Sequence, residues 1–320
     1  TGRAFSDFQK WLKELKNRGI ILTVCSKNNE DTAREPFEKH PEMVLRLDDI
    51  AMFVANWEDK ASNIRFIQQT LNIGMDSMVF IDDNPFERNL VREMIPDILV
   101  PEMPEDPSQY TTFLKKLDLF ETASFSNEDV NRTSQYQAEA KRAQLQQTFA
   151  SIDDYLKGLE MVGEAKPFDA FHIPRISQLT QRSNQFNLRT IRYTEAEIAD
   201  IAASDKYLTL YFTLKDKFGD HGLISVVILE KQGENLFVNE WLMSCRVLKR
   251  TVEELIVNTM ITTAAKNGFK KVIGEYIPTA KNAMVKDIYE KMGFKRIDDA
   301  HFEADVDTFE YNKCFIKLED

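Results

Sequence analysis

The sequence predicts a two-domain α/β protein. Its 320 residues suggest two domains more readily than one. In the first third, short apolar segments alternate with helix-like segments, which is typical of a parallel sheet covered by helices on both faces. Beyond about residue 120, longer strands follow one another before helices return, which indicates a mixed α/β second domain. We expect domains over residues 1–120 and 161–320, joined by a helical linker over 121–160.

The elements of the first domain follow from apolar spacing. Phe5, Phe8, Leu12 and Leu15 recur at helical spacing, which predicts a helix over residues 4–17. Apolar runs predict strands over 20–24, 43–45, 78–81 and 98–100, and helices are expected to begin at Lys60 and Pro85. Polar residues follow the first and third of these strands. Because ligands of parallel α/β sheets bind outside the carboxyl ends of the strands, these residues are expected to share one site.

The second domain is predicted to contain a larger sheet. An extended segment is expected over 161–164 and a helix over 173–183. Longer strands are expected over 207–214, 222–230 and 236–241, the last two joined by a hairpin turn at 231–235. A helix over 252–266, a strand over 271–276 and a helix over 282–292 complete the pattern.

Composition excludes several classes of function. The net charge of −11 argues against nonspecific binding to nucleic acid or to an anionic membrane, since both need a basic face. No segment reaches the roughly 18 apolar residues of a membrane span, and no signal-peptide pattern opens the sequence. The three cysteines are far apart, which argues against a disulfide framework or structural zinc. We expect a cytoplasmic protein.

The polar residues at the predicted strand ends point to phosphate and metal chemistry. Asp82 and Asp83 precede a helix start, where paired carboxylates can hold Mg²⁺. The competing interpretation is a turn at the end of the strand, because these residue types favour turns. The Ser26 hydroxyl and the Lys60 ammonium are groups that grip a phosphoryl oxygen. For Lys60 alone, a solvated helix start is the competing interpretation.

Several motifs carry a family resemblance. They are Val24–Asn28, Glu35–Pro41, Asn56-Trp57 with Lys60, Phe80–Pro85, Ser244–Arg246 and Pro278–Ala283. In this order they resemble the FkbH-like branch of the haloacid-dehalogenase (HAD) superfamily, over essentially the whole chain. The resemblance implies a HAD-like Rossmannoid sheet, with Ser26, Asn28 and Lys60 binding phosphate and Asp82 and Asp83 binding Mg²⁺.

One family motif has no counterpart in the sequence. HAD enzymes carry an Asp-x-Asp-x-Thr loop after their first strand, and nothing in residues 1–20 matches it. Its first Asp would be the nucleophile, and both would complete the metal site. The chain is therefore expected to lack the first strand, to bind Mg²⁺ weakly or not at all, and to have impaired activity.

The resemblance also implies a reaction. FkbH-like proteins take a bisphosphoglycerate, a phosphorylated three-carbon acyl donor, and pass the glyceryl unit to the phosphopantetheine thiol of an acyl carrier protein. The product feeds methoxymalonyl-type extender units for polyketide-type biosynthesis. Cys25, beside Ser26, is the expected acyl-carrying nucleophile, with a pKa lowered by a metal and Lys60. The competing interpretation is a buried structural cysteine.

Residues 161–320 resemble the GNAT N-acyltransferase fold. This implies a pyrophosphate-binding loop at Arg246–Thr251, where Lys249 and Thr251 replace the usual glycines. The predicted residues for acyl-coenzyme A (CoA) or phosphopantetheine binding are Cys245, Arg246, Lys249, Arg250, Asn282 and Tyr289. Arg246, Lys249 and Arg250 would alternatively dock an acidic carrier protein or be solvated helix-start charges. Cys245 competes with Cys25 as the acyl-accepting thiol.

Two other functions stay open from the sequence. One is a Mg²⁺-dependent HAD-type phosphatase with an idle second domain. The other is a non-catalytic docking module for an acyl carrier protein.

Overall fold

The protein is an α/β protein that divides into two compact units. The computed structural model describes residues 2–120 and 131–319. The units are Thr1–Thr148 and Phe149–Asp320. The range predicted as a linker is shared between them, because α7 (Arg132–Gln147) belongs to the first unit and α8 (Ile152–Gly158) to the second. Residues 121–130 of that range lie outside the described residues.

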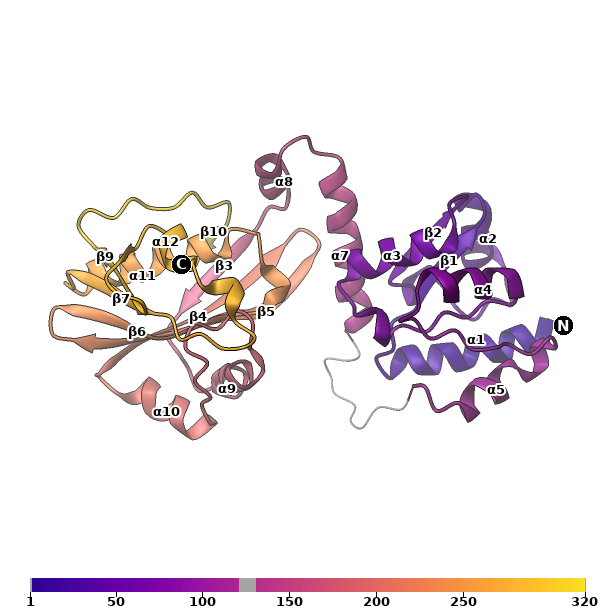
Figure 1. Ribbon diagram of the computed structural model, residues 1–320, viewed down its shortest axis with the longest axis horizontal. Coiled ribbons are helices and arrows are strands. Elements are labelled where there is room, and N and C mark those ends of the chain that lie inside the picture. Colours follow the sequence, from indigo (N-terminus) through magenta and orange to yellow (C-terminus); the bar gives the residue numbers. More distant parts are fainter. Residues whose placement is uncertain (1, 121–130, 320) are drawn as a thin grey trace. The chain divides into compact units, whose positions relative to one another are not determined.

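The first unit alternates helices and strands (Figure 1). Its helices and strands are α1 (Gly2–Asn17), β1 (Thr23–Lys27), α2 (Glu30–Lys39), β2 (Met52–Asn56), α3 (Lys60–Leu71), α4 (Pro85–Met94), α5 (Tyr110–Lys116) and α7. β1 pairs with β2 in parallel, with Cys25 opposite Val54. The extended segments around Val79 and Leu99 meet at a single parallel bridge.

The predicted strand over 43–45 is wrong, and the strand that pairs with β1 is β2 instead. Val44 and Leu45 lie in a loop whose N–H groups donate to Oε1 of Gln9, at 2.9 and 3.1 Å. Leu45 is buried. Its apolar character therefore reflects a buried loop, which a three-residue run cannot distinguish from a strand.

Two apolar clusters cover the strands of the first unit on opposite faces. One joins Phe80 to residues of α3 and α4, such as Ile64 and Val91. The other joins Ile81 to residues of α1 and α5, such as Trp11 and Leu114. Because successive side chains of an extended segment point to opposite faces, Phe80 and Ile81 place this segment between two helical layers, as the sequence predicts.

The second unit is built on one large mixed sheet. Its strands, in spatial order, are β10 (Lys317–Glu319), β3 (Val162–Lys166), β4 (Tyr207–Asp216), β5 (Gly219–Gln232), β6 (Asn235–Met243), β7 (Lys271–Glu275), β9 (His301–Asp305) and β8 (Lys295–Arg296). The helices are α8, α9 (Ile173–Arg182), α10 (Glu195–Ala203), α11 (Val252–Lys266) and α12 (Ile288–Lys291). The pairs β10–β3 and β6–β7 are parallel and the others antiparallel.

The helix predicted over 282–292 is shorter in the structure, where α12 begins only at Ile288. Asn282 lies before it, and its side chain accepts from the N–H of Thr279 and donates to the carbonyl of Ile277. An asparagine that bonds nearby backbone groups favours a turn over a helix. Helix α10 and strand β9 were not predicted from the sequence.

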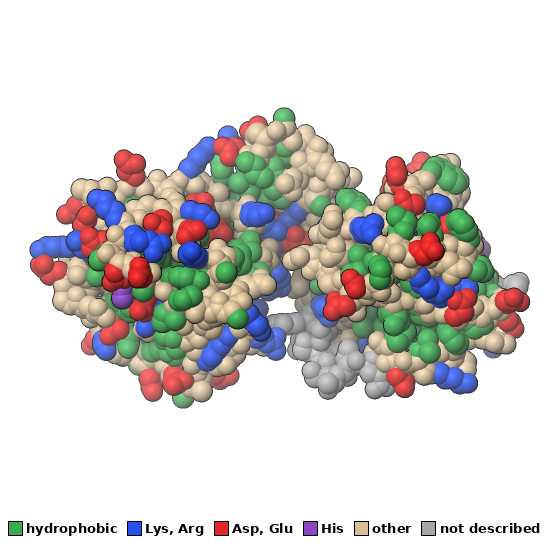
Figure 2. All heavy atoms as spheres, in the orientation of Figure 1, with side chains coloured by type: hydrophobic (Ala, Val, Ile, Leu, Met, Phe, Trp, Pro, Cys, Tyr) green, Lys and Arg blue, Asp and Glu red, His purple; other side chains and the backbone are tan. Residues whose placement is uncertain are grey.

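The surface carries acidic and basic side chains mixed together on the face shown in Figure 2. Among the described residues, no helix has the length and apolar character needed to cross a membrane.

Candidate functional site

A buried ion pair between Lys60 and Asp82 lies at the carboxyl ends of the strands in the first unit. Lys60 is the first residue of α3, which Asp59 caps by accepting the N–H of Ser62 at 2.8 Å. Asp82 follows the extended segment that contains Val79. The Lys60 ammonium donates to Oδ2 of Asp82, and the two side chains are 13% and 6% exposed. The structure thus brings together two of the residues that the sequence predicts for one site.

The turn that carries Asp82 and Asp83 is held by Arg88. Nη1 of this buried arginine donates to the main-chain carbonyls of Asp82 and Asp83, each at 2.9 Å, and Nη2 pairs with Glu102. The N–H of Asn84 donates to Oδ1 of Asp82 at 2.9 Å. The Asp83 side chain is exposed. Arg88 was missed in the sequence analysis.

The described residues do not by themselves fit a Mg²⁺ site. Asp82 is already engaged by Lys60 and Asn84, and Asp83 is the carboxylate next to it. Across residues 2–120 and 131–319, no three His, Cys, Asp or Glu side chains lie together in a way that could hold a metal ion. Mg²⁺ requires near-octahedral oxygen coordination. Metal binding by Asp82 and Asp83 therefore stays a prediction, and no chemical step below depends on it.

The end of β1 contributes Ser26, Lys27 and Asn28 to the same edge. Ser26 lies opposite Ala55 of β2 and is half-buried. The Lys27 ammonium pairs with Oε1 of the buried Glu87, in the first turn of α4, at 3.1 Å. Asn28 accepts the N–H of Asn29 at 2.8 Å, within its own loop. Lys27 was not singled out from the sequence; its place at the strand end gives this edge a second ammonium group.

Cys25 lies close to Lys60 but in an apolar setting. Its Sγ is 3.8 Å from the main-chain carbonyl of Lys60, and the side chain packs against the clusters beneath α3. Burial raises the pKa of Cys25 to about 11, and the opposing charge of Lys60 is the smaller effect. This is opposite to the lowered pKa expected from the sequence, so the thiol is protonated at neutral pH.

The basic residues predicted at the start of α11 separate into two environments. Cys245, Arg246 and Lys249 are exposed. Arg250 is buried: its Nη1 is 3.0 Å from Nε2 of His221 and 3.9 Å from Oδ2 of Asp216. Arg250 therefore belongs to an internal charged cluster and does not face a docking partner.

The backbone of the Arg246–Thr251 loop adopts the conformation that glycine usually provides. Lys249 and Thr251 have φ values of 61° and 60°, in the left-handed region. These are the two positions at which the GNAT resemblance implies glycines. Both residues therefore adopt a left-handed conformation, which costs a residue with a Cβ more than it costs glycine.

Asn282 and Tyr289 are buried and engaged inside the second unit. The Asn282 amide donates to the carbonyls of Asn187 and Ile277, each at 2.9 Å. The Tyr289 ring stacks on Phe302 with centroids 5.2 Å apart. Neither side chain is placed to contact a ligand in this structure.

A short segment, Phe186–Leu188, covers part of β6. β6 pairs with β7 only over Asn235–Phe237. Farther along, the N–H of Leu188 donates to the main-chain carbonyl of Trp241 at 3.2 Å. The N–H of Met243 donates to the main-chain carbonyl of Phe186 at 3.1 Å. Asn282 fastens the segment by its bond to Asn187.

Glu240 on β6 is a buried carboxyl group that the sequence analysis missed. It is fully buried, and its two oxygens accept the N–H groups of Ile191 and Trp241, each at 3.1 Å. Desolvation raises its pKa to about 8, because those N–H groups and the nearby Arg189 offset only part of the cost of burying a charge. Alternate residues of β6, from Leu236 through Val238 to Glu240, are buried, and this alternation was a readable signal.

Comparison with known proteins finds similar solved structures. No family model and no curated protein matches the chain. The N-terminal part of a Bacteroides fragilis protein, containing a phosphatase domain complexed with Mg, is 71% identical over 38% of this chain, with a TM-score of 0.38. The match spans 32% of that chain, about a third of its length.

Two acetyltransferase structures are also similar. An alanine N-acetyltransferase that acts on a ribosomal protein in Escherichia coli is 14% identical over 48% of this chain and 99% of its own, with a TM-score of 0.37. An N-acetyltransferase from Staphylococcus aureus is 14% identical over 46% of this chain and 99% of its own, with a TM-score of 0.34. Similarity at this level does not identify an activity.

Proposed function

We propose that the first unit binds the phosphoryl group of a phosphorylated acyl donor, and that the protein transfers the acyl unit to a carrier-protein thiol. The observation that supports this proposal is the Lys60–Asp82 pair at the carboxyl ends of the strands. The proposed donor is a bisphosphoglycerate and the proposed acceptor is the phosphopantetheine thiol of an acyl carrier protein, as in FkbH-like proteins.

The local electrostatics suit a phosphoryl group. Helices α3 and α4 both begin at this edge, and helix N-termini favour anions. Lys60 and Lys27 add two ammonium groups, which pair with the carboxylates of Asp82 and Glu87 respectively. A phosphate dianion carries more charge than a carboxylate, so it competes with Asp82 for the Lys60 ammonium. Ser26 is the proposed hydroxyl partner of the same group.

The acyl step requires a thiol. Attack of a thiol sulfur on the carbonyl carbon of an acyl phosphate breaks the C–O bond to phosphate, which leaves as inorganic phosphate and yields a thioester. Cys25 is near Lys60, but its raised pKa leaves little thiolate at neutral pH. Cys245 is exposed, and its Sγ is 3.4 Å from Oε1 of Gln185. We keep Cys25 as the proposed acyl carrier because of its position beside Lys60, with Cys245 as the alternative.

The similarity to the Bacteroides fragilis protein agrees with the phosphoryl part of this proposal, because that protein is described as containing a phosphatase domain complexed with Mg. The choice of an acyl carrier protein as acceptor and of a glyceryl donor is based on the family resemblance.

Phosphate binding is the first test. Isothermal titration with 3-phosphoglycerate should detect binding to the protein and its loss in Lys60→Gln. Lys39→Gln is the matched control, because Lys39 pairs with Glu35 on an exposed helix face. Binding that is equal in Lys60→Gln and the control contradicts the proposed phosphoryl site. Circular dichroism checks that Lys60→Gln is folded, and Lys60→Arg, which keeps the charge, should retain part of the affinity.

Acyl transfer is the second test. Mass spectrometry of an acyl carrier protein, incubated with the protein and a bisphosphoglycerate, should show a mass increase of one glyceryl unit. Loss of the increase in Cys25→Ser, with retention in Cys245→Ser, supports Cys25. The reverse result would assign the acyl group to Cys245 in the second unit.

A further inference from the structure

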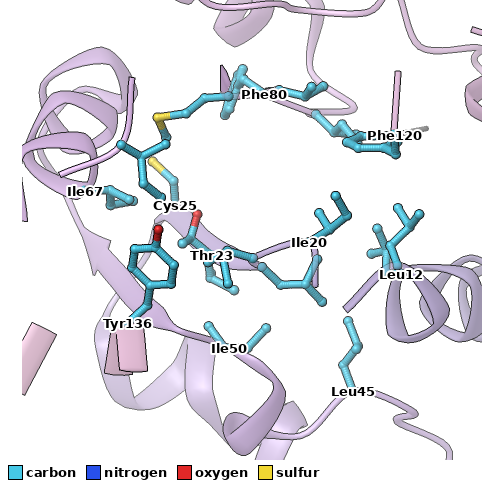
Figure 3. Close-up of a pocket in the computed structure, with 18 of the residues that line it drawn as sticks. Leu12, Ile20, Thr23, Cys25, Leu45, Ile50, Ile67, Phe80, Phe120 and Tyr136 are labelled. Carbon is cyan, nitrogen blue, oxygen red and sulfur yellow. The ribbon is translucent and has the colours of Figure 1, made fainter. Parts of the chain in front are cut away.

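The two cysteines named in the proposed function lie in different surroundings. Cys25 is on the wall of a mostly apolar cavity of about 630 Å³ in the first unit, which Figure 3 shows in close-up. Cys245 is exposed and begins the short turn that follows β6, where its Sγ is 3.4 Å from Oε1 of Gln185. Gln185 directly precedes the Phe186–Leu188 segment. Whether the second unit can hold an acyl-CoA or a pantetheine arm beside Cys245 therefore depends on that segment.

The residues implied by the GNAT resemblance specify where such an arm would lie. The loop Arg246–Thr251 follows β6, whereas Asn282 and Tyr289 follow β7. An arm that reached from the loop toward these two residues would run between β6 and β7. The two strands pair only over Asn235–Phe237, so the edge of β6 that faces β7 needs another partner farther along. Pantetheine contains amide groups, which are able to bond such an edge.

The protein's own chain occupies this place. On one side, Phe186–Leu188 bonds β6 through the carbonyl of Trp241 and the N–H of Met243. On the other side, the N–H of Ile277, just beyond β7, donates to the carbonyl of Leu188 at 2.9 Å. The segment therefore joins β6 to the chain that follows β7, as a short strand between them would.

The segment belongs to the core of the second unit. Phe186 and Leu188 are 2% and 0% exposed. The side chain of buried Asn187 accepts the N–H groups of Arg189 and Thr190 at 3.3 and 2.7 Å. Moving the segment would expose two large apolar side chains and break buried hydrogen bonds, and both effects oppose opening. Mobile lids are instead drawn from segments with few buried contacts.

We propose that the second unit holds no CoA or pantetheine arm between β6 and β7, because Phe186–Leu188 takes the place of that ligand in the native state. The residues implied for the ligand do not fit it. Asn282 donates to the carbonyl of Asn187 and so fastens the segment instead, and Tyr289 is packed in the core. This inference does not depend on the phosphoryl site proposed in the first unit.

The test is hydrogen exchange followed by NMR of the isotope-labelled protein, with acetyl-CoA and CoA as probes. The amides of Leu188, Met243 and Ile277 report on the bonds that hold the segment. Their exchange rates should stay unchanged at probe concentrations up to about 1 mM, the range of weak binding. Binding at another surface leaves these three rates unchanged and supports the proposal. A change in these rates that follows the acetyl-CoA concentration would overturn it, because the segment would then be a lid that the ligand displaces.

Asn282→Ala tests the fastening without any ligand. The variant loses the donor to the carbonyl of Asn187, so the Leu188 amide should exchange about tenfold faster than in the parent protein. Asn267→Ala is the matched control, because Asn267 is exposed and its side chain donates to the carbonyl of Thr263 at the end of α11. Equal exchange in the two variants would contradict a segment fastened by Asn282, and with it the proposal. The acetyl-CoA titration uses the parent protein, so it tests the proposal even where Asn282→Ala is unfolded.

Discussion

The buried carboxyl group of Glu240 should make the stability of the second unit depend on pH. Glu240 is fully buried, and its pKa is raised from an ordinary value of 4.5 to about 8. Between these values the native state keeps a proton that the unfolded chain releases. The free energy of unfolding therefore falls as pH rises, by about 1.4 kcal/mol per pH unit and on the order of 5 kcal/mol over the whole window.

Replacing Glu240 by glutamine removes this titration while keeping the size of the side chain. Glutamine has one carbonyl oxygen for the two N–H groups of Ile191 and Trp241, so one donor loses its acceptor. That loss costs about 1–3 kcal/mol at pH 5, where Glu240 is protonated in the native state. By about pH 8 the variant should be the more stable protein, because it has no buried charge to form.

The assay is urea unfolding followed by fluorescence. The sequence has three tryptophans, and replacing Trp11 and Trp57 by phenylalanine leaves Trp241 as the reporter of the second unit. Glu234→Gln, at an exposed turn, controls for the loss of one charge. A stability difference between Glu240→Gln and the parent that stays constant from about pH 5 to about pH 8 would refute a buried proton at Glu240.

Three further predictions concern close packing, strain and thiol reactivity. Gly274→Ala should destabilise the second unit by about 1–3 kcal/mol or more in urea unfolding, because the new Cβ would lie 2.2 Å from the ring of buried Tyr289; unchanged stability contradicts that packing. Lys249→Gly should raise the melting temperature slightly, because a φ of 61° costs roughly 1–2 kcal/mol for a residue with a Cβ. The gain is partly offset because glycine makes the unfolded chain more flexible. A lower melting temperature contradicts this prediction. Alkylation of Cys25 by iodoacetamide, followed by mass spectrometry, should accelerate about tenfold per pH unit from about pH 7 to about pH 10, given its pKa of about 11; a plateau below about pH 9 contradicts that pKa.

Local signals predicted the amphipathic helices well. Helix α1 follows from apolar residues at helical spacing, and α11 has the bounds expected from its sequence, Val252–Lys266. Helix α10 was missed although Thr194 and Glu197 form a capping box, which is a readable start signal. Strand β2 was missed because a five-residue run gives little periodicity, and its pairing with β1 is a contact between distant residues.

The candidate site was predictable where topology alone decides position. Lys60 and Asp82 meet because parallel strands place their carboxyl ends at one edge. The raised pKa of Cys25 was not predictable, because it depends on apolar side chains from α3 and from residues 78–80. Likewise, Arg88 acts on two carbonyls of a turn, and no residue pattern specifies that such a bond will form.

The second unit covers a strand edge that would otherwise be unpaired. In the second unit, β6 leaves β7 after Phe237, and Phe186–Leu188 takes over its main-chain bonds. Exposed edges invite pairing, and this segment removes one. An acyl-pantetheine arm that bonded the same part of β6 would have to displace Phe186–Leu188, which Asn282 fastens.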